Sequence, residues 1–432
     1  MKKIKKEKLF RIVSICFLGF LFIFYGARFT YNYISENLIN KQTSDLFSDT
    51  IVSKTKKENL TYENNTYTLI GDIDNNYVSY SGILWRVISV YDNEIKIVTD
   101  DSITMIPWGN NKDYLSSNIN TWLNEKLLNN LTSIDYYIQD FDACLNITNN
   151  SSLSECKNLS SKISLLSLND YLKAGANNSF INNGTYFFLS STDENNYPWY
   201  VFDSGGVNID KENHIYGVRA VISLKNTEEF YGSGTKNDPY IVFNNPIDNL
   251  EEVELGSYID YSDYIWKVIS KEDDSVKLVM TEPLKENDIE ITKAYSRYKN
   301  VFDLNDKTGI AYYLNNTFYN KLNHKEYIKS KDYYIGKYTD YNLDEQYSEK
   351  VNCNVALLTL GDNFITEYDD MYLISSIKND GTIPIIKKSM IFSDFVSYES
   401  LIKPVIYLDS SLEIKGGIGD STYPFELRLE DE

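Results

Sequence analysis

The feature that most constrains the fold of this 432-residue chain is an internal repeat. The segment Gly82–Ile88 (GILWRVI) returns as Asp263–Ile269 (DYIWKVI), and Ile95–Val98 returns as Val276–Val279, both at a spacing of 181 residues. Five further blocks recur in the same order: Trp122–Asn124 with Tyr313–Asn315, Ile163–Asp170 with Val355–Asp362, Phe187–Ser191 with Tyr372–Ser376, Val218–Leu224 with Ile402–Leu408, and Gly234–Tyr240 with Gly419–Phe425. Ordered blocks at a nearly constant spacing indicate a duplicated domain. We expect repeat 1 at 61–243 and repeat 2 at 253–428, joined by a polar linker.

The shared blocks indicate where the core lies. Segments 83–88 and 95–98 are rich in β-branched and aromatic residues and flank a turn at Asp92-Asn93, a pattern typical of a β-hairpin. The segment that follows Trp122 has apolar residues at helical spacing. Trp85 and Trp266 lie inside the paired strand blocks, so we expect both indoles in the core.

The N-terminal region predicts a membrane anchor. Residues 1–11 carry a charge balance of +5, and the next sixteen, IVSICFLGFLFIFYGA, carry none. A spanning helix needs about twenty residues, so we predict a transmembrane helix at 12–29, in contact with the lipid bilayer, and a stalk at 30–60. The positive-inside rule then places the N-terminus in the cytoplasm and both repeats outside the cell. A cleaved signal peptide is the alternative, although Tyr25 stands where a small side chain is preferred.

The net charge of −20 argues against one class of partner. Affinity for phosphate rests on Lys and Arg, and with +5 in the first eleven residues the rest of the chain carries a net charge of about −25. We therefore expect no nucleic-acid binding.

The motifs GILWRVI, ISLLSLNDY, GVRAVISL and GSGTKNDPY resemble those of an uncharacterised family of extracellular domains from low-GC Gram-positive bacteria. That family is thought to be related to the C-type-lectin-like fold of the formylglycine-generating (sulfatase-modifying) group. The resemblance covers nearly all of both repeats and is weaker in the second, where Pro404 replaces Ala220. It implies an α+β class: two tandem C-type-lectin-like domains with twisted antiparallel sheets and long loops. It implies no catalytic residue, because the reactive cysteine pair of the enzymes and the calcium-binding tripeptides of the lectins are absent.

The titratable residues do not predict an enzyme. The two histidines, His214 and His324, fall outside the shared blocks, and neither has a nucleophile or a metal-ligand spacing beside it. We predict no catalytic residue, no metal and no cofactor. Cys144 and Cys156 flank a short Asn/Ser-rich segment and are candidates for a disulfide in an oxidising compartment, whereas Cys353 has no evident partner in its own repeat.

The candidate ligand-binding residues are aromatic and lie beside turns in repeat 1: Trp108, Tyr197, Trp199 and Tyr200. Such side chains serve either as ligand anchors or as packing beneath a loop. We expect a cell-surface binding or adhesion protein that recognises a protein or a glycan through loops. The alternative is a non-catalytic envelope scaffold that assembles with other membrane proteins.

Overall fold

The computed structural model describes residues 46–92, 94–110, 113–145, 147–149, 152–153, 156–242, 247–335, 337–338, 349–378, 380–387 and 390–429. The described residues are mostly β-sheet, with 41% of them in strands and 17% in helices. The predicted α+β class with two C-type-lectin-like domains is therefore wrong. Segments predicted to be long loops form additional strands, because polar stretches pair through their backbones without the hydrophobic alternation that predicts a strand.

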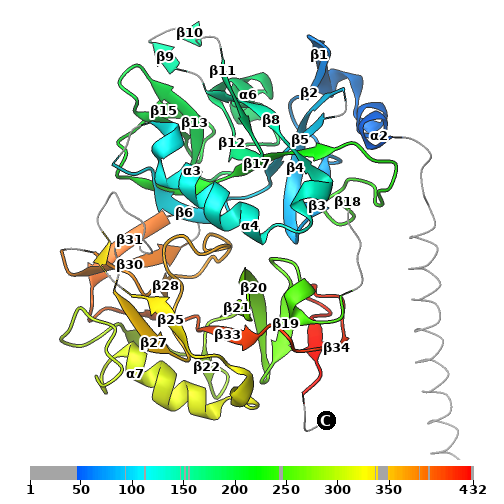
Figure 1. Ribbon diagram of the computed structural model, residues 1–432. Coiled ribbons are helices and arrows are strands. Elements are labelled where there is room, and N and C mark those ends of the chain that lie inside the picture. Colours follow the sequence, from blue (N-terminus) through cyan, green and yellow to red (C-terminus); the bar gives the residue numbers. More distant parts are fainter. Residues whose placement is uncertain are drawn as a thin grey trace, which may run out of the picture.

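Repeat 1 contains two large sheets and a two-stranded ribbon (Figure 1). The nine-stranded sheet consists of β1 (Leu60–Glu63), β2 (Thr66–Leu69), β3 (Tyr77–Tyr80), β4 (Ile83–Tyr91), β5 (Glu94–Thr99), β7 (Ile138–Gln139), β12 (Ile163–Leu165), β17 (Ala220–Lys225) and β18 (Tyr240–Ile241). The seven-stranded sheet consists of β6 (Thr104–Pro107), β9 (Ile147–Asn149), β10 (Ser152–Leu153), β13 (Phe187–Asp193), β14 (Pro198–Val201), β15 (Val207–Ile209) and β16 (Ile215–Val218). The ribbon pairs β8 (Phe141–Leu145) with β11 (Lys157–Ser161).

Repeat 2 contains a six-stranded sheet, a five-stranded sheet and three two-stranded ribbons. The six-stranded sheet consists of β19 (Tyr258–Tyr261), β20 (Tyr264–Glu272), β21 (Ser275–Met280), β33 (Val405–Asp409), β34 (Ile414–Gly416) and β35 (Phe425–Leu427). The five-stranded sheet consists of β24 (Thr292–Ala294), β28 (Tyr372–Leu373), β30 (Thr382–Lys387), β31 (Met390–Phe395) and β32 (Glu399–Leu401). The ribbons pair β22 (Lys285–Glu286) with β23 (Ile289–Glu290), β25 (Lys331–Tyr334) with β27 (Lys350–Cys353), and β26 (Lys337–Tyr338) with β29 (Ile377–Lys378).

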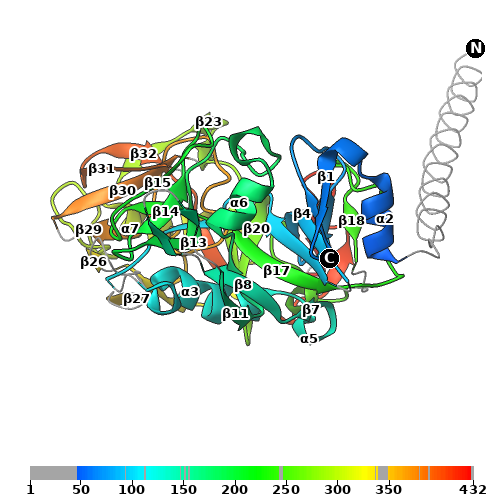
Figure 2. The same ribbon diagram turned by 90° about the horizontal axis from the view of Figure 1, so that it is seen from above.

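The α-helices in the described ranges are short. They are α2 (Phe47–Lys54), α3 (Asn118–Trp122) continued by a π-helical turn (Leu123–Leu127) and α4 (Leu128–Asn130), α5 (Ile134–Tyr137), α6 (Leu168–Lys173), and α7 (Ile310–Tyr312) continued by a π-helical turn (Tyr313–Phe318). Ser117 and Ser167 cap the N-termini of α3 and α6 by accepting backbone N–H groups. Figure 2 shows α2 at one end of the molecule beside β18, where Phe47 packs edge-on against Tyr240 with ring centroids 5.1 Å apart.

The same strand order builds the core of both repeats. In the first, β3, β4, β5 and β17 are neighbours; in the second, β19, β20, β21 and β33 are neighbours. The last strand of each repeat pairs parallel with the first of these, β18 with β3 and β35 with β19. Trp85 and Trp266 are fully buried. Each indole N–H donates to the carbonyl of the tyrosine five residues earlier, Tyr80 at 3.0 Å and Tyr261 at 2.9 Å, so the two core indoles are held in the same way.

The two repeats pack directly against each other. The helical segment 118–130 of repeat 1 lies between them (Figure 1). Trp122 donates its indole N–H to the Gly361 carbonyl at 2.7 Å, and Asn130 Oδ1 accepts the Lys271 N–H at 2.6 Å. The buried apolar side chains of both repeats form one continuous cluster.

The prediction of a single-pass membrane protein is corrected. No helix in the described ranges is long and apolar enough to cross a membrane. The predicted spanning segment 12–29, the basic tail 1–11 and the first part of the stalk lie outside the described residues. Residues 46–60 of the predicted stalk are instead folded, because Phe47 and Ile51 of α2 are buried against repeat 1.

Candidate functional site

Repeat 1 contains an open groove of about 760 Å³. One wall is the β1–β2 hairpin, and the opposite wall is the β8–β11 ribbon. Residues of β4, β5 and α6 line the space between these walls. The groove therefore lies between two pairs of strands that are not hydrogen-bonded to each other in the described ranges.

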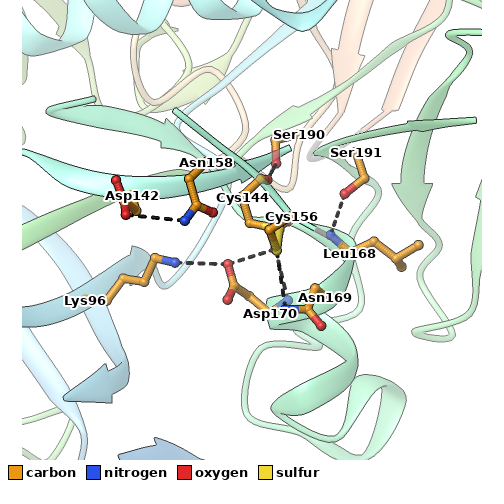
Figure 3. Close-up of a disulfide and its surroundings, with 11 residues drawn as sticks. Lys96, Asp142, Cys144, Cys156, Asn158, Leu168, Asn169, Asp170, Ser190 and Ser191 are labelled. Carbon is orange, nitrogen blue, oxygen red and sulfur yellow. Dashed lines mark hydrogen bonds and ion pairs between the residues drawn. A yellow bond between two sulfur atoms is a disulfide. The ribbon is translucent and has the colours of Figure 1, made fainter. Parts of the chain in front are cut away.

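A disulfide between Cys144 and Cys156 stabilises the second wall (Figure 3). It links the two strands at the end of the ribbon where β8 ends and β11 begins, and the two Cα atoms are 5.0 Å apart. Cys144 is buried, and its carbonyl accepts the Ser190 hydroxyl at 3.1 Å, whereas Cys156 is exposed. The covalent link fixes the ribbon while leaving one sulfur on the surface of the groove.

An ion pair lies between the disulfide and the sheet (Figure 3). Lys96 Nζ on β5 is 3.1 Å from Asp170 Oδ2 on α6. Burial alone would raise the pKa of Asp170, but Lys96 and the Ser167 hydroxyl outweigh burial and hold that pKa below its ordinary value. Asp170 is therefore a carboxylate over the physiological pH range.

Repeat 2 contains the same ion pair in a closed setting. Lys277 Nζ and Asp362 Oδ1 are 2.5 Å apart, and both side chains are less than a tenth exposed. The side chains of Lys96 and Asp170 keep 17% and 24% of their surface exposed. The pair is thus part of the common fold, and in repeat 1 it has also become part of a surface groove.

Carboxylates dominate the groove lining. Glu63, Glu94, Asp140, Asp142 and Asp170 face two lysines, a formal balance of −3. Burial, followed by the charge of Asp142, raises the pKa of Glu94 above its ordinary value. Neighbouring carboxylates attract a cation, because a positive group relieves their mutual repulsion.

The lining offers no catalytic constellation. Neither histidine lines the groove. His214 instead contacts Asp210 on another surface, with Nδ1 2.6 Å from Oδ2. Among the described residues, no group of three His, Cys, Asp or Glu side chains is placed to hold a metal ion. The groove can bind and orient a ligand electrostatically.

The structure places the four predicted aromatic residues away from this groove. Trp108 is fully buried, with ring centroids 5.8 Å from Tyr114 and 5.5 Å from Phe188. Tyr197 follows the β13 end, and its N–H donates to Asp193 Oδ1 at 2.7 Å. Trp108 therefore packs in the core, although the turn residues beside it favour a loop.

Trp199 and Tyr200 are adjacent on β14 and half-buried. Successive strand residues point to opposite faces, so the two rings do not form one platform. Tyr200 stacks on Tyr216 of β16 with centroids 4.5 Å apart, and Tyr216 also stacks on Tyr186 at 6.0 Å. The Tyr216 hydroxyl donates to Asp210. This tyrosine stack could not be predicted from sequence, because it depends on how β14 and β16 flank β13.

The sequence does not predict the groove, although it carries one signal for the groove floor. The Lys of the blocks IKIV and VKLV and the Asp of SLND and TLGD recur in both repeats. A basic and an acidic residue retained together inside apolar blocks indicate a buried or half-buried ion pair. The walls carry no such signal, since β1, β2, β8 and β11 lie outside the shared blocks.

Comparison with known proteins gives no relative: no family model, no curated protein and no solved structure matches this chain. The resemblance to the extracellular domain family remains a prediction.

Proposed function

We propose that this protein is a non-catalytic binding protein and that its ligand is a basic segment of another protein, held in the groove of repeat 1. The observation that carries the proposal is the acidic lining of an open groove whose walls are fixed by a disulfide and by strand pairing. A preformed site lowers the entropic cost of binding. Its carboxylates outnumber its lysines and therefore select for Lys and Arg side chains.

The two walls support an extended rather than a compact ligand. Glu63 on the hairpin and Asp142 on the ribbon carry negative charge on opposite sides, and Glu94 lies between them on β5. A peptide that runs along the groove brings successive basic side chains to alternate walls, because its side chains alternate in direction. The Lys96–Asp170 pair adds polar groups to the floor without adding net charge.

The test is calorimetric titration of the full chain with a pentalysine peptide at low salt. Solvent-exposed ion pairs contribute about 0.2–1 kcal/mol each. The double variant Glu94→Gln/Asp142→Asn should therefore lose about tenfold in affinity. Raising the salt concentration should weaken wild-type binding as well, since exposed charges are screened.

The matched control is Glu413→Gln/Glu426→Gln, which removes the same net charge from β35 and the loop before β34 in repeat 2. If both double variants lose affinity equally, the peptide responds to net charge and the groove is not the site. If the folded wild type shows no binding at all, the scaffold alternative becomes the better account.

A further inference from the structure

The two repeats meet through unlike faces. Repeat 1 contributes a helix face, formed by the backbone near Ile103 and by the segment 118–130. Repeat 2 contributes a sheet face, formed by the edge of β20 and the loop 361–366. Within this contact, the Phe364 N–H donates to the Ile103 carbonyl at 2.5 Å.

Duplication gives each repeat both faces. One helix face and one sheet face are used in the contact between the repeats, so repeat 1 retains a sheet face and repeat 2 retains a helix face. A contact between unlike faces of equivalent units continues from one molecule to the next unless something blocks the two outer faces. Each outer face of this protein is covered by a hairpin of its own chain.

The β1–β2 hairpin covers the strand edge of the sheet face in repeat 1. Val90 of β4 stands at the position of Lys271, whose N–H binds Asn130 in the contact between the repeats. In repeat 1 this edge is paired with β2 instead, with Tyr67 opposite Val90. The hairpin thus covers the edge of β4, whereas the equivalent edge of β20 in repeat 2 is contacted by the end of the helical segment 118–130 of repeat 1.

The chain that follows this hairpin covers a second part of the same face. Ala174 stands at the position of Thr366, which donates its hydroxyl across the contact between the repeats. The Ala174 carbonyl accepts the Gly71 N–H at 2.9 Å. Leu172, at the position of the buried Phe364, is left 41% exposed, so an apolar contact point of the face persists beside the cover.

The β22–β23 hairpin covers the helix face of repeat 2. Leu284 stands at the position of Ile103, and its carbonyl accepts the Ile291 N–H at 3.0 Å. Tyr313 stands at the position of the interface tryptophan, and its hydroxyl donates to Glu286 Oε1 at 2.7 Å. The counterparts of two groups that bridge the repeats, the Ile103 carbonyl and the Trp122 indole, are thus satisfied within the second copy.

We propose that residues 60–73 and 285–291 are end caps, and that the faces beneath them are a latent head-to-tail interface for a second copy of this chain. Each cap covers a face whose counterpart is already paired inside the molecule. The caps therefore keep a chain built from two self-complementary units from extending into a filament. This inference is independent of the ligand that the groove binds.

The test uses two full-chain variants, each with one cap opened. Tyr67→Pro/Thr68→Pro opens the first cap, because proline lacks the N–H that pairs β2 with its neighbours. Glu286→Ala/Ile291→Pro opens the second cap, because it removes the contacts of Glu286 with Tyr313 and Lys321 and the Ile291 N–H that binds the Leu284 carbonyl. Sedimentation velocity then measures the mass of each variant alone and of their equimolar mixture.

Each variant alone should sediment as a single 50.0 kDa chain, because the face that would bind its open face is still capped. The mixture should form a complex of twice that mass. A mixture that stays monomeric, with both variants folded by circular dichroism, overturns the proposal. The proposal is also overturned if one variant alone associates as strongly as the mixture does, because that outcome indicates unspecific exposure of apolar surface.

Should the double proline variant fail to fold, Gly71→Val loosens the same cap at its second contact. Gly71 has a φ of 77°, and a Cβ there would lie 3.2 Å from the Asn59 amide nitrogen. Valine is strained in this conformation. The mixture of this variant with the second-cap variant should again give the double-mass complex, and its absence contradicts the proposal in the same way.

Discussion

Glu254, at the junction of the two repeats, gives the most quantitative prediction. Its side chain is largely buried, and in the described part of the chain its Oε1 atom has no hydrogen-bond partner. Burial raises its pKa from 4.5 to about 7, against the opposing effects of Lys271 and the Gly82 N–H. The perturbation is Glu254→Gln, which keeps the shape and removes the ionisation.

The magnitude follows from linkage. A pKa raised from 4.5 to about 7 corresponds to a cost of about 3 kcal/mol once the carboxyl is ionised in both states. The folded state holds the proton more tightly than the unfolded state between these two pH values. Its contribution to stability is therefore highest at acidic pH and falls as the pH rises from 4.5 to about 7.

The assay is urea unfolding followed by tryptophan fluorescence at several pH values. Between about pH 5 and about pH 8 the wild type should lose about 2 kcal/mol relative to Glu254→Gln. Glu251→Gln removes an exposed carboxylate three residues away and should leave the pH dependence of the wild type unchanged. If the curves of the wild type and Glu254→Gln run parallel across this range, the reasoning about the junction is refuted.

Three further predictions concern the core and the groove. Lys277→Met leaves a buried carboxylate without its cation and should lower the free energy of unfolding in urea by about 3–5 kcal/mol. Lys96→Met, in the more exposed pair, should lower it clearly less, and equal losses would contradict the difference in burial. Reducing the groove disulfide should lower the free energy of unfolding by about 3 kcal/mol, and an unchanged urea midpoint would argue against it. Trp108→Ala should lower the free energy of unfolding by about 3–5 kcal/mol. Trp199→Ala should leave pentalysine binding unaltered, and a loss of binding would place the peptide-binding site at β14 instead of the groove.

The core could be predicted from the sequence because each shared core position occurs twice, once in each repeat. Trp85 and Trp266 are equivalent in sequence, and both are buried on equivalent strands with equivalent indole hydrogen bonds. The helical periodicity after Trp122 also corresponds to a helical segment, 118–130. Periodicity and recurrence report burial, and burial is what these residues have in common.

The fold class and the aromatic residues could not be predicted on the same basis. The fold class rested on a resemblance of motifs, and the many short strands between the shared blocks carry little periodicity. Trp108 is flanked by Pro107 and Gly109, which favour a turn and predict exposure. Packing against Phe188 overrides that local signal.

The groove and the end caps depend on what differs between the repeats. The first cap, residues 60–73, and the wall strand β8 have no equivalents among the matched blocks. Segments without a counterpart in the other repeat give no recurrence signal in the sequence. Their roles emerge only when the contacts of one repeat are set beside those of the other, as with Val90 and Lys271.

Hydrogen–deuterium exchange of the full chain with and without pentalysine tests the central claim most directly. Binding in the groove predicts slower amide exchange in residues 60–69 and 141–145, the segments that form its two walls. Exchange in β14 and β16, which carry the tyrosine stack, should not change. Slower exchange confined to β14 and β16, or no change anywhere at saturating peptide, would contradict the assignment of the groove as the binding site.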